Sequence, residues 1–173
     1  MNPIQEINTN IPSEFNIRII DRLFNVTGWG FATENATRKD LNNSDFGLSL
    51  LTYSDQFQAN QDNILNNFGE VVFDIIRNHT TYGFKKIRRL YWNWYHPGSI
   101  TNYHQDSNNQ NDYSILYNLH TNDGGTEFNI NNEKLFCTSN ESNAFVFSSV
   151  LNHRGIAPKN NLHRFSLNII THV

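Results

Sequence analysis

The chain has 173 residues and a formal net charge of −3, with 38% hydrophobic and 13% aromatic residues. A chain of this length can bury a substantial core, and it predicts a single domain over residues 1–173. The slightly acidic balance gives no general bias toward nucleic acid or an anionic membrane surface.

The compartment is predicted from three features. Cys137 is the only cysteine, which excludes an intramolecular disulfide and suits a reducing environment. No apolar run approaches the roughly 18 residues of a membrane span. The opening "MNPIQEINTN" lacks the charged-then-apolar pattern of a signal peptide. We therefore expect a soluble cytoplasmic protein that does not engage a membrane.

Two helices are predicted in the first half of the chain. In residues 12–25, Phe15, Ile19 and Leu23 lie four positions apart, as on one helix face. Residues 62–79 form the stronger pattern, because apolar residues recur there at spacings of three, four and seven. These residues are Ile64, Leu65, Phe68, Val71, Val72, Ile75 and Ile76.

The other predicted elements are short strands, rich in aromatic and branched residues and separated by turn-forming sequences. The first ten residues are expected to lack regular structure. The expected strands span residues 28–33, 46–53, 86–95, 112–119, 126–130, 144–148 and 164–171. This order predicts a mostly β sandwich or barrel with helices against one sheet. Approximately residues 11–84 would form supporting helices and strands, and approximately residues 85–172 would form the functional core.

The stretch "YHQD" contains a histidine and a carboxylate at strand spacing, His104 and Asp106. Residues two apart in an extended segment point to the same side, so both could face one metal ion. The spacing arises readily by chance. His153, which follows the apolar strand predicted at residues 144–148, supplies a third candidate ligand.

The last predicted strand has one polar and one apolar face. Arg164, Ser166 and Asn168 alternate with the apolar residues Phe165, Leu167 and Ile169. Polar groups on a buried face are unfavourable unless they have partners, so this face is expected to line a pocket that holds an anion. The planar guanidinium of arginine suits a carboxylate.

Two histidines and one carboxylate are typical of non-haem Fe(II) oxygenases, and zinc would also accept them. In order, the chain carries "YHPG" (residues 95–98), "HQD" (104–106), "YNLHTNDGGTEF" (117–128), His153 and "RFS" (164–166). This set resembles the Fe(II)/2-oxoglutarate-dependent oxygenases, in particular the prolyl-4-hydroxylase-like branch and its short viral and bacterial members.

The resemblance implies a double-stranded β-helix, that is, a cupin-like jelly roll, buttressed by N-terminal helices. It implies Fe(II) bound by His104, Asp106 and His153, with 2-oxoglutarate anchored by Arg164 and Ser166. O₂ would then convert 2-oxoglutarate to succinate and CO₂ while a C–H bond of the acceptor is hydroxylated.

Four further residues are predicted near the site. Tyr95 and Tyr117 are candidate contacts of 2-oxoglutarate, and Asn93 and Glu127 are candidate contacts of the acceptor. Each could instead be an ordinary core or surface residue.

The acceptor is predicted to be a peptidyl, prolyl-like residue or a free amino acid, so a peptide or small molecule is the favoured partner. A nucleobase is the alternative, since "NWYHPG" also resembles a segment of oxidative nucleic-acid demethylases. Those enzymes carry a second arginine after the position of Arg164, which this chain lacks. A non-catalytic, cupin-like module that binds 2-oxoglutarate is the remaining alternative.

Overall fold

The computed structural model describes residues 3–31, 47–56, 59–97, 99, 101–160 and 163–173. The elements within them are β1 (Ile4–Asn8), α1 (Ser13–Asn25), β2 (Gly30–Phe31), β3 (Leu48–Ser54), α2 (Asn63–His79), β4 (Lys86–Tyr95), β5 (Asp112–Asn118), β6 (Gly125–Ile130), β7 (Glu133–Thr138), β8 (Asn143–Ser148), β9 (His153–Ile156) and β10 (Arg164–His172). The predicted mostly β class is therefore confirmed.

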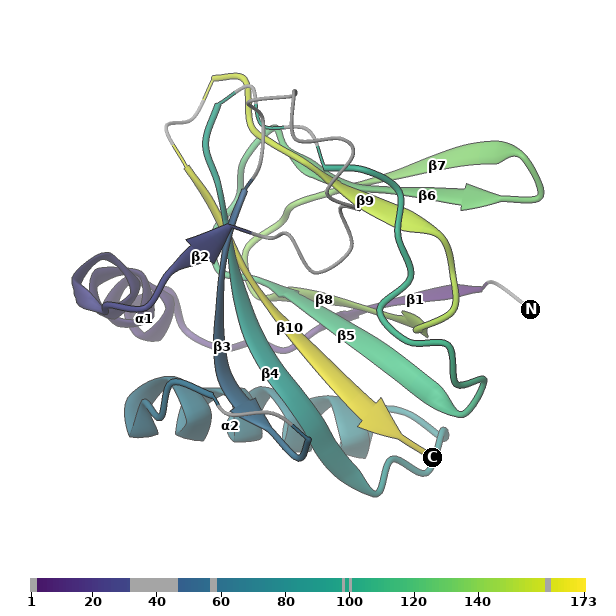
Figure 1. Ribbon diagram of the computed structural model, residues 1–173, viewed down its shortest axis with the longest axis horizontal. Helices are drawn as coiled ribbons and strands as arrows, with labels where there is room; N and C mark the ends of the chain where they lie inside the picture. The colour runs from purple at the N-terminus through teal and green to yellow at the C-terminus, as the bar shows by residue number, and fades with distance from the viewer. Residues whose placement is uncertain (1–2, 32–46, 57–58, 98, 100, 161–162) are drawn as a thin grey trace.

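The strands form two antiparallel sheets. The larger sheet has the order β1-β8-β5-β10-β4-β3-β2, and the smaller has the order β7-β6-β9. In Figure 1 the two helices lie on one side of the larger sheet, and the smaller sheet lies on the other. Phe128 of β6 packs with Leu116 and Phe145 of the larger sheet, so the two sheets share an apolar core.

Strand β10 lies at the centre of the larger sheet, between β5 and β4. Its apolar residues Phe165, Leu167 and Ile169 join the core beneath the helices. The alternating residues Arg164, Ser166 and Asn168 are equally buried but face the smaller sheet. The predicted separation of the two faces of this strand is confirmed.

Both predicted helices are present, with a different set of buried residues. In α1 the buried face contains Asn16, Ile19 and Leu23, whereas Phe15 is 55% exposed. Asn16 takes the inward position because its side-chain amide forms hydrogen bonds with Tyr117, Glu141 and Ser142.

Helix α2 packs closely on the larger sheet through Leu65, Phe68, Val72 and Ile76. A Cβ atom at Gly69 would lie 2.9 Å from Leu90 Cδ1 of β4. Glycine at this position therefore lets the helix approach the sheet, which outweighs its poor helix propensity.

Three strands were not predicted. Residues 4–8 were expected to lack regular structure, but β1 pairs with β8 and buries Ile4 and Ile7. Strands β7 and β9 both pair with β6. Strands β1 and β9 depend on partners far away in the chain rather than on local preference. Strand β7 instead forms a hairpin with β6 through Asn131 and Asn132, which both have positive φ.

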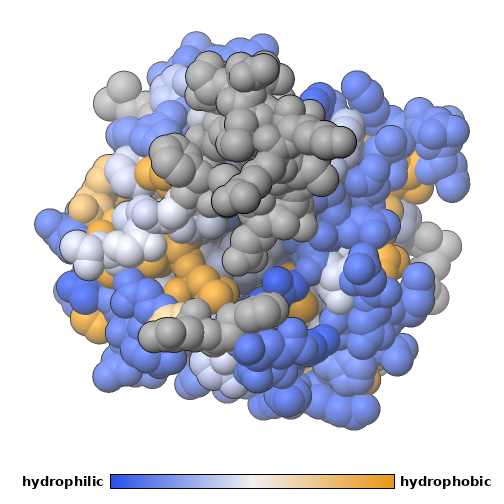
Figure 2. Space-filling model, viewed as in Figure 1, coloured by the Kyte–Doolittle hydropathy of each residue, from blue (hydrophilic) through white to orange (hydrophobic). Residues whose placement is uncertain are grey.

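Parts of the predicted strands 28–33 and 46–53, and Gly98 of the "YHPG" motif, lie outside the described residues. Within the described ranges, neither helix is long and apolar enough to cross a membrane. The face of the molecule seen in Figure 2 is largely hydrophilic with smaller hydrophobic areas.

Asp62 is expected to be important for stability because it caps α2 and pairs with α1. Its carboxylate accepts hydrogen bonds from the backbone of Ile64 and Leu65 and from the guanidinium of Arg22, at 2.7 Å. Losing a capping carboxylate costs about 1–2 kcal/mol. We therefore expect Asp62→Ala to lower the free energy of unfolding, measured in urea, by about 1–2 kcal/mol. The control is Asp74→Ala, which removes an exposed ion pair with Arg77 and should lower it by less than about 0.5 kcal/mol.

The pH dependence gives a second measure of the same interaction. Burial opposes ionisation of Asp62, but hydrogen bonds from Leu65 and Arg22 and the charge of Arg22 outweigh it and lower the pKa. A lowered pKa contributes stability above the unfolded value, about 3.9, and this contribution is lost as the pH falls further. The difference in free energy of unfolding between the wild-type protein and Asp62→Ala should therefore shrink below about pH 4. A difference that does not change with pH would contradict the role of the Asp62 charge.

Candidate metal centre

The backbone brings His104 and His153 together although 48 residues separate them in the sequence. The N–H of His104 donates to the carbonyl of His153 at 2.9 Å, and the N–H of His153 donates to the carbonyl of His104 at 3.0 Å. Their ring centroids lie 4.6 Å apart. His153 begins β9, and His104 forms an isolated bridge beside it.

Both imidazoles are oriented for metal binding by a carbonyl two residues earlier. Nδ1 of His104 lies 3.0 Å from the carbonyl oxygen of Asn102, and Nδ1 of His153 lies 2.9 Å from that of Leu151. A carbonyl only accepts, so each Nδ1 carries the hydrogen. Each Nε2 is then left with a free lone pair, as a metal ligand requires.

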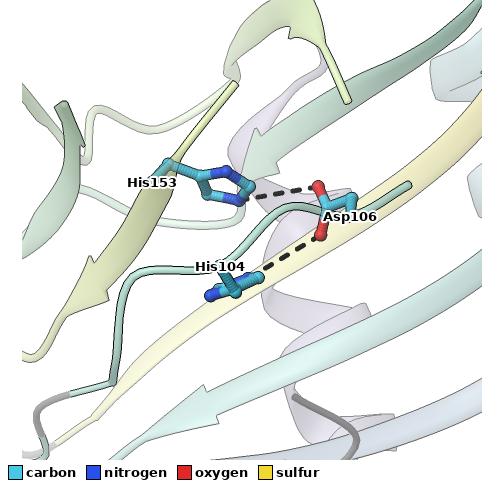
Figure 3. Close-up of side chains that lie close together, drawn as sticks. All are labelled: His104, Asp106 and His153. Carbon is cyan, nitrogen blue, oxygen red and sulfur yellow. Dashed lines mark ion pairs between the residues drawn. The ribbon is translucent and has the colours of Figure 1, made fainter. Parts of the chain in front are cut away.

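Asp106 completes the group. Its Oδ2 lies 3.5 Å from His153 Nε2, and its Oδ1 lies 3.7 Å from His104 Nε2. The three ligand atoms lie within 4.8 Å of one another, the only such group of three or more in the part of the chain that the structure describes. Figure 3 shows the three side chains converging on one point. The predicted ligands are thus brought together, and two imidazoles with one carboxylate suit a divalent transition metal.

Asp106 is ionised despite its burial. Burial alone would raise its pKa, but the adjacent His153 and His104, with hydrogen bonds from Ser114 and Tyr91, lower the pKa to about 2. Burial acts in the opposite sense on His153, whose pKa is lowered because the charged imidazolium is disfavoured there. The carboxylate and the neutral imidazole are the forms that bind a metal.

Three side chains hold the carboxylate in place. Tyr91 donates to Oδ1 at 2.6 Å, while Ser114 and Asn168 donate to Oδ2 at 2.6 Å and 3.1 Å. Asn168 belongs to the polar face predicted for β10, and Tyr91 is its direct partner on β4. Nothing in the sequence singled out Ser114, because its contact depends on where the loop before β5 returns to the sheet.

Arg164 is fully buried and largely without partners. Its Nη2 donates to Thr126 Oγ1 at 3.1 Å. Its Nε and Nη1 and the nearby Ser166 Oγ have no hydrogen-bond partner among the residues that the structure describes. Among the described residues, no carboxylate forms an ion pair with it. A buried unpaired cation is strongly unfavourable, so this position is suited to an anion.

Tyr95 of β4 lies beside the guanidinium of Arg164. The guanidinium carbon of Arg164 lies 4.9 Å from the centre of the Tyr95 ring, and the two residues are directly paired across the strands. A Cβ atom at Gly155 would lie 2.5 Å from the Tyr95 hydroxyl, so only glycine leaves room for this ring. Asn93, which pairs with Ser166, lies on the same face. Both residues lie where they were predicted; their contacts with ligands stay predictions.

The structure corrects the predictions for Tyr117 and Glu127. Tyr117 pairs with Leu167 and so faces the helices, where its hydroxyl donates to Asn16 at 2.7 Å. Glu127 alternates with the inward-facing Thr126 and Phe128 and is therefore on the outer side of the smaller sheet. There it pairs with Arg154 at 2.7 Å. In both cases the strand was predicted but not which of its faces points inward.

The sequence matches no family model and no curated protein. The fold, in contrast, is similar to several solved structures. A prolyl-4-hydroxylase from Pseudomonas putida is 14% identical with a TM-score of 0.66, over 99% of this chain and 93% of that chain. A prolyl hydroxylase from Trichoplax adhaerens, in complex with a fragment of hypoxia inducible factor, is 14% identical with a TM-score of 0.72, over 99% and 84% of the chains.

HygX from Streptomyces hygroscopicus, with nickel, 2-oxoglutarate and hygromycin B bound, is 6% identical with a TM-score of 0.71, over 98% of this chain and 82% of that chain. These similarities confirm the predicted fold, the jelly roll found in 2-oxoglutarate-dependent Fe(II) oxygenases.

We expect His153→Ala to reduce the affinity for Co(II), a stable substitute for Fe(II), by at least about 100-fold, because it removes a direct ligand. Calorimetric titration of the purified protein would measure this loss. His172→Ala is the matched control, since His172 pairs with Asp112 outside the group and its removal should leave Co(II) affinity unchanged. Equal affinities in His153→Ala and the wild-type protein would contradict the site.

Proposed function

We propose that this chain, which has the fold of the 2-oxoglutarate-dependent Fe(II) oxygenases, is a dioxygenase that hydroxylates a C–H bond. The observation that carries the proposal is the pairing of two unusual features on one face of β10. Arg164 and Ser166 present unpartnered donors at one end, and Asn168 holds a metal-binding carboxylate at the other.

His104, Asp106 and His153 would hold Fe(II), and three protein ligands leave three octahedral positions for other groups. When bound, Fe(II) would supply the redox chemistry that couples decarboxylation of 2-oxoglutarate, to succinate and CO₂, with hydroxylation of the acceptor by the second oxygen atom of O₂.

The residues of this chain supply binding and orientation. Arg164 offers two free guanidinium nitrogens to the carboxylate of 2-oxoglutarate that lies away from the metal, and Ser166 adds a hydroxyl donor. Tyr95 and Gly155 shape the wall beside it. Burial of this position excludes water and so strengthens each of these interactions.

A peptidyl residue, prolyl-like, or a free amino acid is the proposed acceptor. The order of the motifs and the net charge of −3 favour it over a nucleobase. The similarity to a prolyl hydroxylase bound to a peptide fragment supports the same choice. Asn93, whose buried amide lies beside Ser166, is the proposed polar contact on this side of the site.

The role of Arg164 is tested by measuring how tightly the Co(II) form of the protein binds 2-oxoglutarate. Arg164→Met should weaken this binding about 10- to 100-fold, the effect of losing charge-assisted hydrogen bonds. Arg154→Met is the matched control, because it removes an arginine from the outer side of the smaller sheet. Equal weakening in both variants, or none in Arg164→Met, would contradict the assignment.

The acceptor is tested by succinate formation from 2-oxoglutarate and O₂ in the Fe(II) form. We expect prolyl-containing peptides or free amino acids to stimulate it, and Asp106→Ala to abolish it. If only single-stranded DNA or RNA stimulates succinate formation, the acceptor is a nucleobase instead. Tight binding of 2-oxoglutarate with no turnover under any condition would contradict the enzymatic proposal and favour a binding module.

A further inference from the structure

Hydrogen bonds from the described residues leave the carboxylate of Asp106 a single free lone pair. A carboxylate has about four lone-pair positions, two on each oxygen. Ser114 and Asn168 occupy both positions on Oδ2, at 2.6 Å and 3.1 Å. Tyr91 occupies one position on Oδ1, at 2.6 Å, so the remaining position on Oδ1 is the one available to a metal.

The orientation of the Asn168 amide follows from its neighbours. The hydroxyl hydrogen of Tyr91 is directed at Asp106, so the Tyr91 oxygen accepts from Asn168 Nδ2. The ionised carboxylate also only accepts. Both contacts therefore require the NH₂ group of Asn168, and its Oδ1 is left buried with no partner in the described part of the chain.

An unpartnered buried acceptor is unfavourable by about 1–3 kcal/mol, and an apolar side chain would avoid it. Ser114 is itself held by Ser149, since their hydroxyl oxygens lie 2.8 Å apart. The backbone carbonyl of Ser149 also accepts the backbone N–H of Asp106. The donors on Oδ2 are thus fixed by a network that reaches both the side chain and the backbone of the ligand.

We propose that Asn168 and Ser114 are positioning residues that confine Asp106 to one-oxygen binding of the metal and so keep a coordination position open. The inference rests on the proposed function. Three protein ligand atoms leave three octahedral positions, two for the keto acid of 2-oxoglutarate and one for O₂. If Oδ2 also bound the metal, only two positions would remain, and chelation by 2-oxoglutarate would compete with Asp106.

The experiment measures two affinities by anaerobic calorimetry: that of the protein for Co(II), and that of the Co(II) form for 2-oxoglutarate. Asn168→Leu keeps a similar volume and removes a donor from Oδ2. The freed lone pair on Oδ2 could then bind Co(II) as well, so we expect the Co(II) affinity to be no weaker than in the wild-type protein. Because Oδ2 would compete with 2-oxoglutarate for the same position, the 2-oxoglutarate affinity should fall at least about 10-fold.

Ser114→Ala removes the other donor from Oδ2 and should change the two affinities in the same directions, which keeps the test valid if Asn168→Leu does not fold. Tyr91→Phe removes a donor from Oδ1 instead and should cause a smaller loss of 2-oxoglutarate affinity. Asn16→Leu is the structural control, because it removes a fully buried amide on the helix side of the larger sheet. It should lower the unfolding midpoint without changing either affinity.

Two results would overturn the inference. In the first, Asn168→Leu and Ser114→Ala bind Co(II) and 2-oxoglutarate as the wild-type protein does. In the second, both variants lose as much affinity for Co(II) as for 2-oxoglutarate. A loss of 2-oxoglutarate affinity in Asn16→Leu equal to that in Asn168→Leu would also overturn it, since the effect would then be general loosening. Failure of the wild-type protein itself to bind Co(II) or 2-oxoglutarate would instead overturn the proposed function.

Discussion

Asp106 carries a negative charge into the space between the two sheets, where a charge without partners would be unfavourable by several kcal/mol. Hydrogen bonds from Tyr91, Ser114 and Asn168 and the proximity of two histidines make this burial tolerable. Because these donors come from β4, β5 and β10, the carboxylate can be satisfied only when three neighbouring strands are in register. The metal site and the centre of the larger sheet therefore depend on each other.

Arg164 presents the complementary charge on β10, four residues before Asn168, which donates to Asp106. No carboxylate among the described residues forms an ion pair with Arg164. Ser166 lies between Arg164 and Asn168 on the same face of β10, and Asp106 is paired with His104 and His153 rather than with Arg164. Arg164 is consequently left able to bind an external anion, and Asp106 is left able to bind a cation. A dicarboxylate that also chelates a metal satisfies both requirements at once, which is the physical basis of the proposed cosubstrate.

Much of this site could be predicted because strands have a simple period. The two faces of β10 were separated correctly, and the pair His104 and Asp106 was placed on one side of an extended segment. The same period could not say which face of β5 or β6 points inward. Tyr117 and Glu127 therefore face away from the site, toward Asn16 and Arg154 respectively.

The sequence by itself determined the kinds of ligand, their order along the chain and the alternation of polar and apolar residues on β10, since all of these are local. Only the tertiary structure decided that β1 and β9 form and that His153 lies beside His104, because these depend on pairing between distant segments. It also decided how many lone pairs Asp106 keeps, since that number depends on donors from separate strands meeting at one carboxylate.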